Sequence, residues 1–117
     1  MTELGEVVQS LAARDGVQAV LLLSSDGLPI EHAARGVFDS ETVAALGATL
    51  AKHVELLGQG AGRGELATAV LDYADGLLVL ARAGAGDWLA ILAAPEADIG
   101  PLLFDLRQHR SALASLL

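Results

Sequence analysis

Residues 17–34 read VQAVLLLSSDGLPIEHAA, which is an aliphatic run, a turn and a second, more polar run. The first run, residues 17–24, is almost continuously apolar, and Ser25-Asp26-Gly27 has the composition of a tight turn. The sequence therefore predicts a β-hairpin. Because Pro29 cannot donate a ladder hydrogen bond, residues 28–34 should form an edge strand and the first run an inner strand.

Two amphipathic segments flank this hairpin. Apolar residues recur at helical spacing near the start of the chain and predict a first helix over residues 3–14. After the hairpin, Asp39 or Ser40 can cap a long helix that runs to about Leu57. One stripe of this helix is strongly apolar and is expected to face the sheet, and it consists of Val43, Leu46, Leu50, Val54 and Leu57. The back of the helix then carries smaller side chains and few charges, namely Ala45, Ala48, Lys52, Glu55 and Leu56.

A glycine-rich connector, residues 58–64, precedes three further strand candidates. These are residues 65–73, 77–82 and 87–94, separated by short glycine-containing turns. The last two are apolar on both faces, as central strands are, whereas the first begins and ends with acidic residues. We therefore expect residues 65–73 to form the second edge, in an antiparallel sheet of order 2-1-5-4-3 with the strands numbered along the chain.

A last helix begins near Asp98, which can act as its cap, and carries Pro101 in its first turn, where the missing N–H is harmless. Its buried stripe is expected to contain Ile99, Leu102, Leu103, Leu106, Leu113 and Leu116. Inner strands with two apolar faces need cover on both sides. The sequence thus predicts one α/β domain of the α+β type over residues 1–117, with the long helix on one face and the first and last helices on the other.

Composition excludes several classes of function. The chain carries 15 acidic and 7 basic residues, a formal net charge of −8, and the basic residues are scattered. Nucleic-acid binding needs clustered positive charge, so we expect no nucleic-acid partner. The longest unbroken apolar run, residues 88–94, is too short to cross a bilayer, so we expect no direct membrane insertion. An acidic amino terminus and the lack of cysteine lead us to expect a cytoplasmic protein.

No catalytic, cofactor or metal site is predicted. A phosphate-binding loop follows a strand, opens a helix and ends in Lys-Ser or Lys-Thr, whereas residues 58–64 follow a helix and contain no lysine. The histidines His32, His53 and His109 lie in three separate elements without the spacing of metal ligands. Arg63, alone on the connector, could reach the phosphates of a partner as an arginine finger, although a loop arginine is more often only solvated.

Four short stretches, in this order, resemble the Roadblock/dynein light chain family. They are GVQAVL at residues 16–21, SDGLPI at 25–30, DGLLV at 75–79 and APEADIG at 94–100, and the last two are similar to the bacterial branch encoded beside Ras-like GTPases. The succession of helix, hairpin, long helix, three-stranded meander and helix is the same. The resemblance covers essentially the whole chain.

The resemblance implies a homodimer that forms through the long helix and the third strand and joins two five-stranded sheets into one of ten strands. It would place at the interface the back of the helix and the third-strand edge, that is Ala45, Ala48, Lys52, Leu56, Leu66, Ala67, Thr68, Ala69 and Val70. The resemblance further implies that such a dimer binds a small GTPase, here a Ras-like one, or a motor component, adjusts its nucleotide cycle or location, and carries no nucleotide itself. Arg63 is the residue that could contact this partner.

A small-ligand sensor of the PAS or profilin type is the alternative, because those modules also pack helices on a five-stranded antiparallel sheet. A sensor pocket needs convergent polar groups inside, and these strands offer almost only Ala, Val and Leu. The sequence therefore favours the homodimeric, non-catalytic adaptor.

Overall fold

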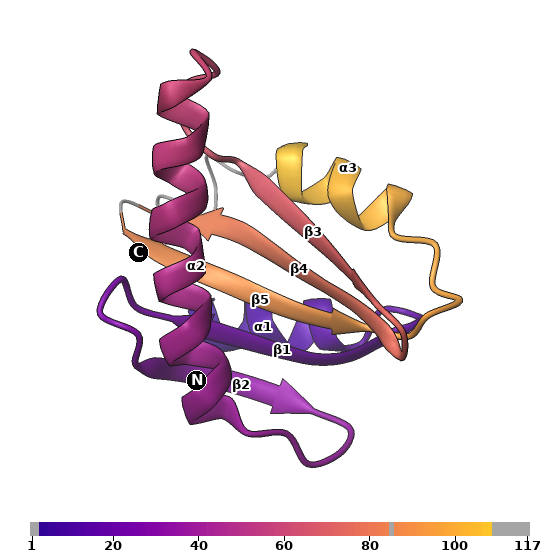
Figure 1. Ribbon diagram of the computed structural model, residues 1–117. Helices are drawn as coiled ribbons and strands as arrows, with labels where there is room; N and C mark the ends of the chain where they lie inside the picture. Colours follow the sequence, from indigo (N-terminus) through magenta and orange to yellow (C-terminus); the bar gives the residue numbers. More distant parts are fainter. Residues whose placement is uncertain (1–2, 85, 109–117) are drawn as a thin grey trace.

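The strand order of the sheet is the predicted one. The computed structural model describes residues 3–84 and 86–108, and the five strands are antiparallel in the order β2-β1-β5-β4-β3. Figure 1 shows the elements along the chain, which are α1 (Glu3–Ala12), β1 (Val17–Leu23), β2 (Pro29–Ala34), α2 (Ser40–Gly60), β3 (Thr68–Tyr73), β4 (Gly76–Ala83), β5 (Asp87–Ala93) and α3 (Gly100–Gln108).

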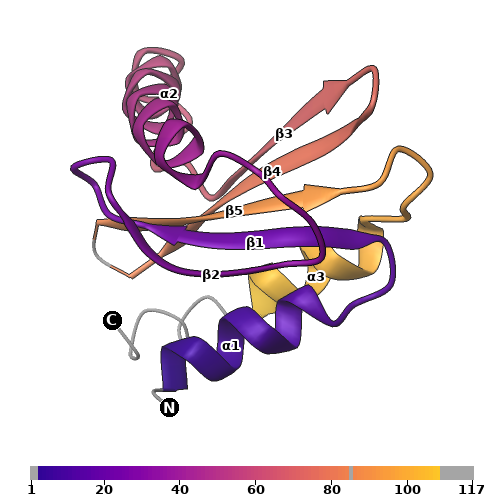
Figure 2. The same cartoon turned by 90° about the horizontal axis from the view of Figure 1, so that it is seen from below.

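Helices cover both faces of the sheet, as predicted. Figure 2 shows α2 on one side, with α1 and α3 together on the other. Because side chains alternate along a strand, β1 contributes side chains to the core on both faces of the sheet. Val20 and Leu22 pack in a cluster with residues of α1 and α3, whereas Leu21 and Leu23 pack in a second cluster under α2. This explains why the inner strands are apolar on both faces.

The β1–β2 hairpin forms where the sequence predicts it. The N–H of Ser24 donates to the carbonyl of Leu28 at 2.9 Å, and Gly27 takes a positive φ of 84° in the turn. Leu21 of β1 lies between His32 of β2 and Ala90 of β5, which makes β1 an inner strand and β2 an edge.

The start of α2 agrees with the sequence and its end does not. Asp39 is the N-cap, and its carboxylate accepts the backbone N–H of Thr42 at 3.1 Å and the Thr42 hydroxyl at 2.6 Å. These hydrogen bonds lower the pKa of Asp39, that from the hydroxyl most strongly. The helix continues to Gly60, beyond the predicted end at Leu57, because a glycine costs a helix only about 1 kcal/mol and the N–H of Ala61 bonds to the Leu57 carbonyl.

The face of α2 that meets the sheet differs in part from the predicted one. The fully buried residues are Ala44, Ala48 and Ala51. Val43 and Leu50 of the predicted stripe are partly buried against the same cluster, whereas Leu46 and Leu57, also expected in the core, are exposed. The sheet already supplies large side chains beneath the helix, so only small helix residues fit against it at close approach. Ala48 therefore lies in the core of its own domain and not on the back of the helix.

Smaller differences concern the ends of elements. Helix α1 ends at Ala12, before the predicted end at Arg14, and β3 begins at Thr68, three residues after the predicted start. In α3, Leu102 and Leu106 are buried as expected. The predicted core residues Leu113 and Leu116 lie outside the described residues.

Candidate interaction surface

One flank of α2 and the neighbouring part of the sheet enclose a groove of about 640 Å³. Its lining contains no carboxylate, ammonium or guanidinium group, and it consists of Thr42, Val43, Leu46, Gly47, Thr49, Leu50 and His53 from α2, Leu71 and Tyr73 from β3, and Leu78 and Leu80 from β4. An open groove that is mostly apolar is typical of a binding surface.

The groove exists because α2 covers only part of the sheet. Figure 1 shows α2 crossing the strands, while the turn that joins β3 to β4 lies well to one side of it. Ala69 and Leu71 of β3 pair with Leu80 and Leu78 of β4, and Leu80 belongs to the core cluster under α2. The side chains of Ala69 and Leu71 therefore face the side of α2, beyond the part of the sheet that the helix covers.

Large apolar side chains stand exposed beside this groove. Leu46 is 64% exposed and Leu57 is 70% exposed on the same flank of α2, and Tyr73 of β3 is exposed as well. Exposed apolar side chains that gather beside a groove are typical of a site where another molecule binds. A second hollow of about 290 Å³ lies further along the sheet and is more polar, because Gln18 and Arg35 line it together with Leu92 of β5, which pairs with Leu78.

The β3 edge adjoins the groove and presents backbone hydrogen-bonding groups. The N–H of Arg82 donates to the carbonyl of Ala67 at 3.0 Å, which makes these two residues a hydrogen-bonded pair of the antiparallel ladder. Since such pairs alternate along a ladder, the N–H and C=O of Thr68, Val70 and Asp72 point away from β4. A further strand could bond to them.

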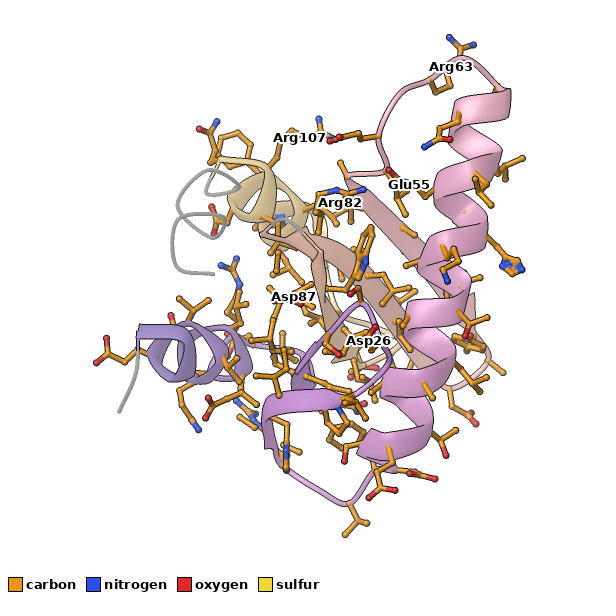
Figure 3. All side chains as sticks on the ribbon, turned by 90° about the vertical axis from the view of Figure 1, so that its left-hand side faces the viewer. Asp26, Glu55, Arg63, Arg82, Asp87 and Arg107 are labelled. Atoms are coloured by element: carbon orange, nitrogen blue, oxygen red, sulfur yellow. The ribbon has the colours of Figure 1, made fainter. Side chains whose placement is uncertain are left out.

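A polar cluster ties α2 to the sheet at the end of the groove near β3 (Figure 3). The Glu55 carboxylate accepts hydrogen bonds from Nη2 of Arg82 at 2.6 Å and from the backbone N–H of Leu66 at 2.9 Å. Nε of Arg82 donates to the Leu66 carbonyl at 3.0 Å, and its guanidinium carbon lies 4.7 Å from the ring centroid of Trp88. Glu55 thus faces the sheet, although the sequence placed it on the back of the helix.

Sequence comparison identifies the family of the chain. The characteristic sequence of the Roadblock/LC7 domain matches residues 3–93. The chain belongs to the Roadblock/LC7 domain family. A search of curated proteins finds no match.

Solved structures share the fold of this Roadblock/LC7 domain along nearly its whole length. The crystal structure of a Roadblock/LC7 domain from Streptomyces avermitilis is 26% identical, with a TM-score of 0.81 over 96% of this chain and 98% of that one. MglB from Myxococcus xanthus is 18% identical, with a TM-score of 0.88 over 99% and 95%. A structure of MglB with a tetrameric arrangement is 21% identical, with a TM-score of 0.83 over 95% and 85%. At the last two identities the likeness concerns the fold alone.

The interface residues predicted from the sequence do not all lie together in this Roadblock/LC7 domain. Ala45, Lys52 and Leu56 are exposed on the flank of α2 that does not line the groove, and Ala48 is buried beneath the helix. The remaining five, Leu66, Ala67, Thr68, Ala69 and Val70, lie on β3 or immediately before it. Their role at an interface stays a prediction.

Sequence reasoning missed the most exposed apolar residues in and beside the groove. Leu46, Leu57 and Tyr73 were not among the predicted interface residues, although the helix stripe that contains the two leucines was recognised. The whole apolar stripe was assigned from the sequence to the contact with the sheet. Periodicity shows that a stripe is apolar, but it does not show which surface covers it.

The remaining candidates do not assemble into a site. Among residues 3–84 and 86–108, no group of three His, Asp or Glu side chains is placed to hold a metal ion. His32 lies on β2, away from His53 on α2, and His109 lies outside the described residues. Arg63 is exposed on the connector after α2, where its backbone N–H donates to the Gly58 carbonyl at 2.8 Å. No helix in the described part of the chain is long and apolar enough to span a membrane.

Proposed function

We propose that this Roadblock/LC7 domain forms a homodimer through the groove beside α2 and the edge of β3, and that the dimer is a non-catalytic adaptor for a Ras-like small GTPase. The observation that carries the proposal is the apolar groove itself, with Leu46 and Leu57 exposed along it.

A second copy of the chain is the occupant that fits this groove best. In a twofold dimer each partner uses the same surface, so a surface must be complementary to itself. Here the α2 flank carries exposed leucines and the adjoining sheet forms the floor of the groove. The leucines of each copy could therefore pack into the groove of the other. Each copy carries a formal net charge of −8, but the groove lining holds none of these charges, which keeps their repulsion away from the contact.

The β3 edge supports the same arrangement. Antiparallel pairing of two β3 strands would use the outward N–H and C=O groups of Thr68, Val70 and Asp72, and would join the two sheets into one of ten strands. The exposed edge of β3 would then be protected. The related MglB structure with a tetrameric arrangement shows that a protein of this fold assembles with itself.

The GTPase partner rests on the family and on its bacterial branch, which the sequence resembles. Proteins of the Roadblock/LC7 family are generally non-catalytic regulators. A dimer built through α2 and β3 would place the two α2 helices side by side and create a composite surface that one copy lacks. The two connectors with Arg63 would lie at the ends of these helices, where they could contact a bound partner.

A pair of matched leucines tests the proposal. Leu46 and Leu56 lie on the same helix and are 64% and 59% exposed, but only Leu46 lines the groove. Wild type and Leu56→Arg should sediment as dimers at micromolar concentration, and both should bind the purified Ras-like GTPase of the same genome. Leu46→Arg should be a folded monomer that has lost this binding.

The outcomes separate the two halves of the proposal. A monomeric wild-type protein refutes the homodimer, and an apolar small ligand becomes the competing occupant of the groove. If monomeric Leu46→Arg captures the GTPase with wild-type affinity, the dimer stands but the composite surface is not where the GTPase binds. Loading the GTPase with a GTP analogue and with GDP shows which state is recognised.

A further inference from the structure

Among residues 3–84 and 86–108, His53 is the only histidine that lines the groove. It lies on α2, is exposed, and its Nδ1 is 3.3 Å from the carbonyl oxygen of Thr49, one turn earlier in the helix. A carbonyl can only accept a hydrogen bond, so the tautomer that makes this contact carries its hydrogen on Nδ1.

In the described part of the chain, no charged group of the groove lining faces His53. The groove residues of α2 around it are Thr42, Leu46, Thr49 and Leu50, β3 contributes Leu71 and Tyr73, and β4 contributes Leu78 and Leu80. Tyr73 is the only other titratable side chain among them, and a phenol is uncharged at neutral and acid pH. The nearest ionisable residues along α2 are turned elsewhere, since Lys52 lies outside the groove lining and Glu55 bonds to Arg82.

We infer that protonation of His53 opens the homodimer, so that the dimer is stable near pH 7.5 and weakens towards pH 5.5. The inference rests on the proposed homodimer. A second copy seated on the groove would remove water from His53, and the groove offers no carboxylate to compensate an imidazolium charge. A twofold dimer buries two copies of His53, so the free-energy cost of burying the imidazolium arises twice. Histidine is the side chain whose charge changes in this pH range.

The sign of this effect opposes that of the overall charge. The chain carries a formal net charge of −8 with its histidines neutral, so acidification makes each copy less negative and reduces the repulsion between copies. Overall charge alone would therefore tighten the dimer at pH 5.5. Weakening of the dimer in acid therefore requires a titratable group inside the dimer interface whose charged form is disfavoured by burial.

The experiment measures the dissociation constant of the wild-type dimer by sedimentation at pH 7.5 and pH 5.5, with circular dichroism at both values to show that the fold persists. We expect the dissociation constant to rise by about tenfold or more at pH 5.5. His53→Gln, which stays neutral, should dimerise at both pH values. His32→Gln is the matched control, because His32 lies on β2, outside the groove, and it should keep the wild-type pH dependence.

Failure of this inference and failure of the proposed homodimer give different results. A dimer that is equally strong or stronger at pH 5.5 overturns the role of His53 and leaves the dimer standing. Weakening in acid that persists in both His53→Gln and a second variant, His53→Asn, also overturns it. A wild-type protein that is monomeric at pH 7.5 refutes the homodimer, and the inference with it.

Discussion

The carboxylate of Glu55 on α2 lies 2.6 Å from Nη2 of Arg82 on β4, and the two side chains are only 21% and 19% exposed. This ion pair also holds the backbone of Leu66, the second residue before β3, through one hydrogen bond to its N–H and one to its carbonyl. It therefore connects the helix beside the groove to the strand that forms the free edge.

Loss of this pair should lower stability. Glu55→Ala leaves the Arg82 guanidinium and the Leu66 N–H without their partner, and we expect the free energy of unfolding to fall by about 2–3 kcal/mol, as for hydrogen bonds to charged groups. Urea denaturation measures the change. The control is Asp105→Ala, which removes the ion pair with Arg14, because Asp105 is 43% exposed and such a pair contributes roughly 0–1 kcal/mol. Equal losses in the two variants would contradict the prediction.

Substitutions of Ala48 and Ala45 test which face of α2 is buried against the sheet. Ala48→Arg places an unpaired charge beneath the helix, among Leu21, Leu23 and Leu80, at a cost on the order of several kcal/mol, so the domain should unfold. Ala45→Arg should leave it folded, because Ala45 is exposed. Circular dichroism at 25 °C checks both. A folded Ala48→Arg protein would show that the helix face assigned here is wrong.

Gly76, which opens β4 after the β3–β4 turn, should not tolerate a side chain. Its φ is 152°, and a Cβ there would lie 2.6 Å from the carbonyl oxygen of Ala93. We expect Gly76→Ala to lower the free energy of unfolding by about 1–3 kcal/mol. Gly60→Ala, at the end of α2, has open space around it and should instead raise stability by up to about 1 kcal/mol. Thermal unfolding of the two variants should shift in opposite directions.

The Asp39 cap predicts a pH dependence with a definite sign. Hydrogen bonds from Thr42 hold the pKa of Asp39 below its model-compound value of 3.8, so the carboxylate stabilises the native state above that pH. The contribution is lost as the pH falls through the folded-state pKa. Asp39→Ala should therefore destabilise the domain at pH 7, with the difference from wild type shrinking below pH 3.8. A difference that stays constant down to pH 2.5 would show that the charge of Asp39 plays no part.

Local sequence pattern was sufficient for the strands and for the start of the long helix. Continuous apolar runs identified the inner strands, Pro29 identified an edge, and Asp39 identified the cap, because each of these signals acts within a few neighbouring residues. The strand order followed from the same signals, since three hairpin connections and two polar edges leave few ways to arrange five strands.

Only the tertiary structure decided which face of α2 the sheet covers. An amphipathic pattern gives the width of an apolar stripe, but the residues buried in a helix depend on the side chains opposite. Here Ala44, Ala48 and Ala51 are fully buried against the large leucines of β1 and β4, and Val43 and Leu50 only partly. The pairing of Glu55 with Arg82 was likewise beyond the sequence, because 27 positions separate them and only packing brings them together. The strands and caps could be found residue by residue, whereas the groove arises from how a helix and a sheet meet.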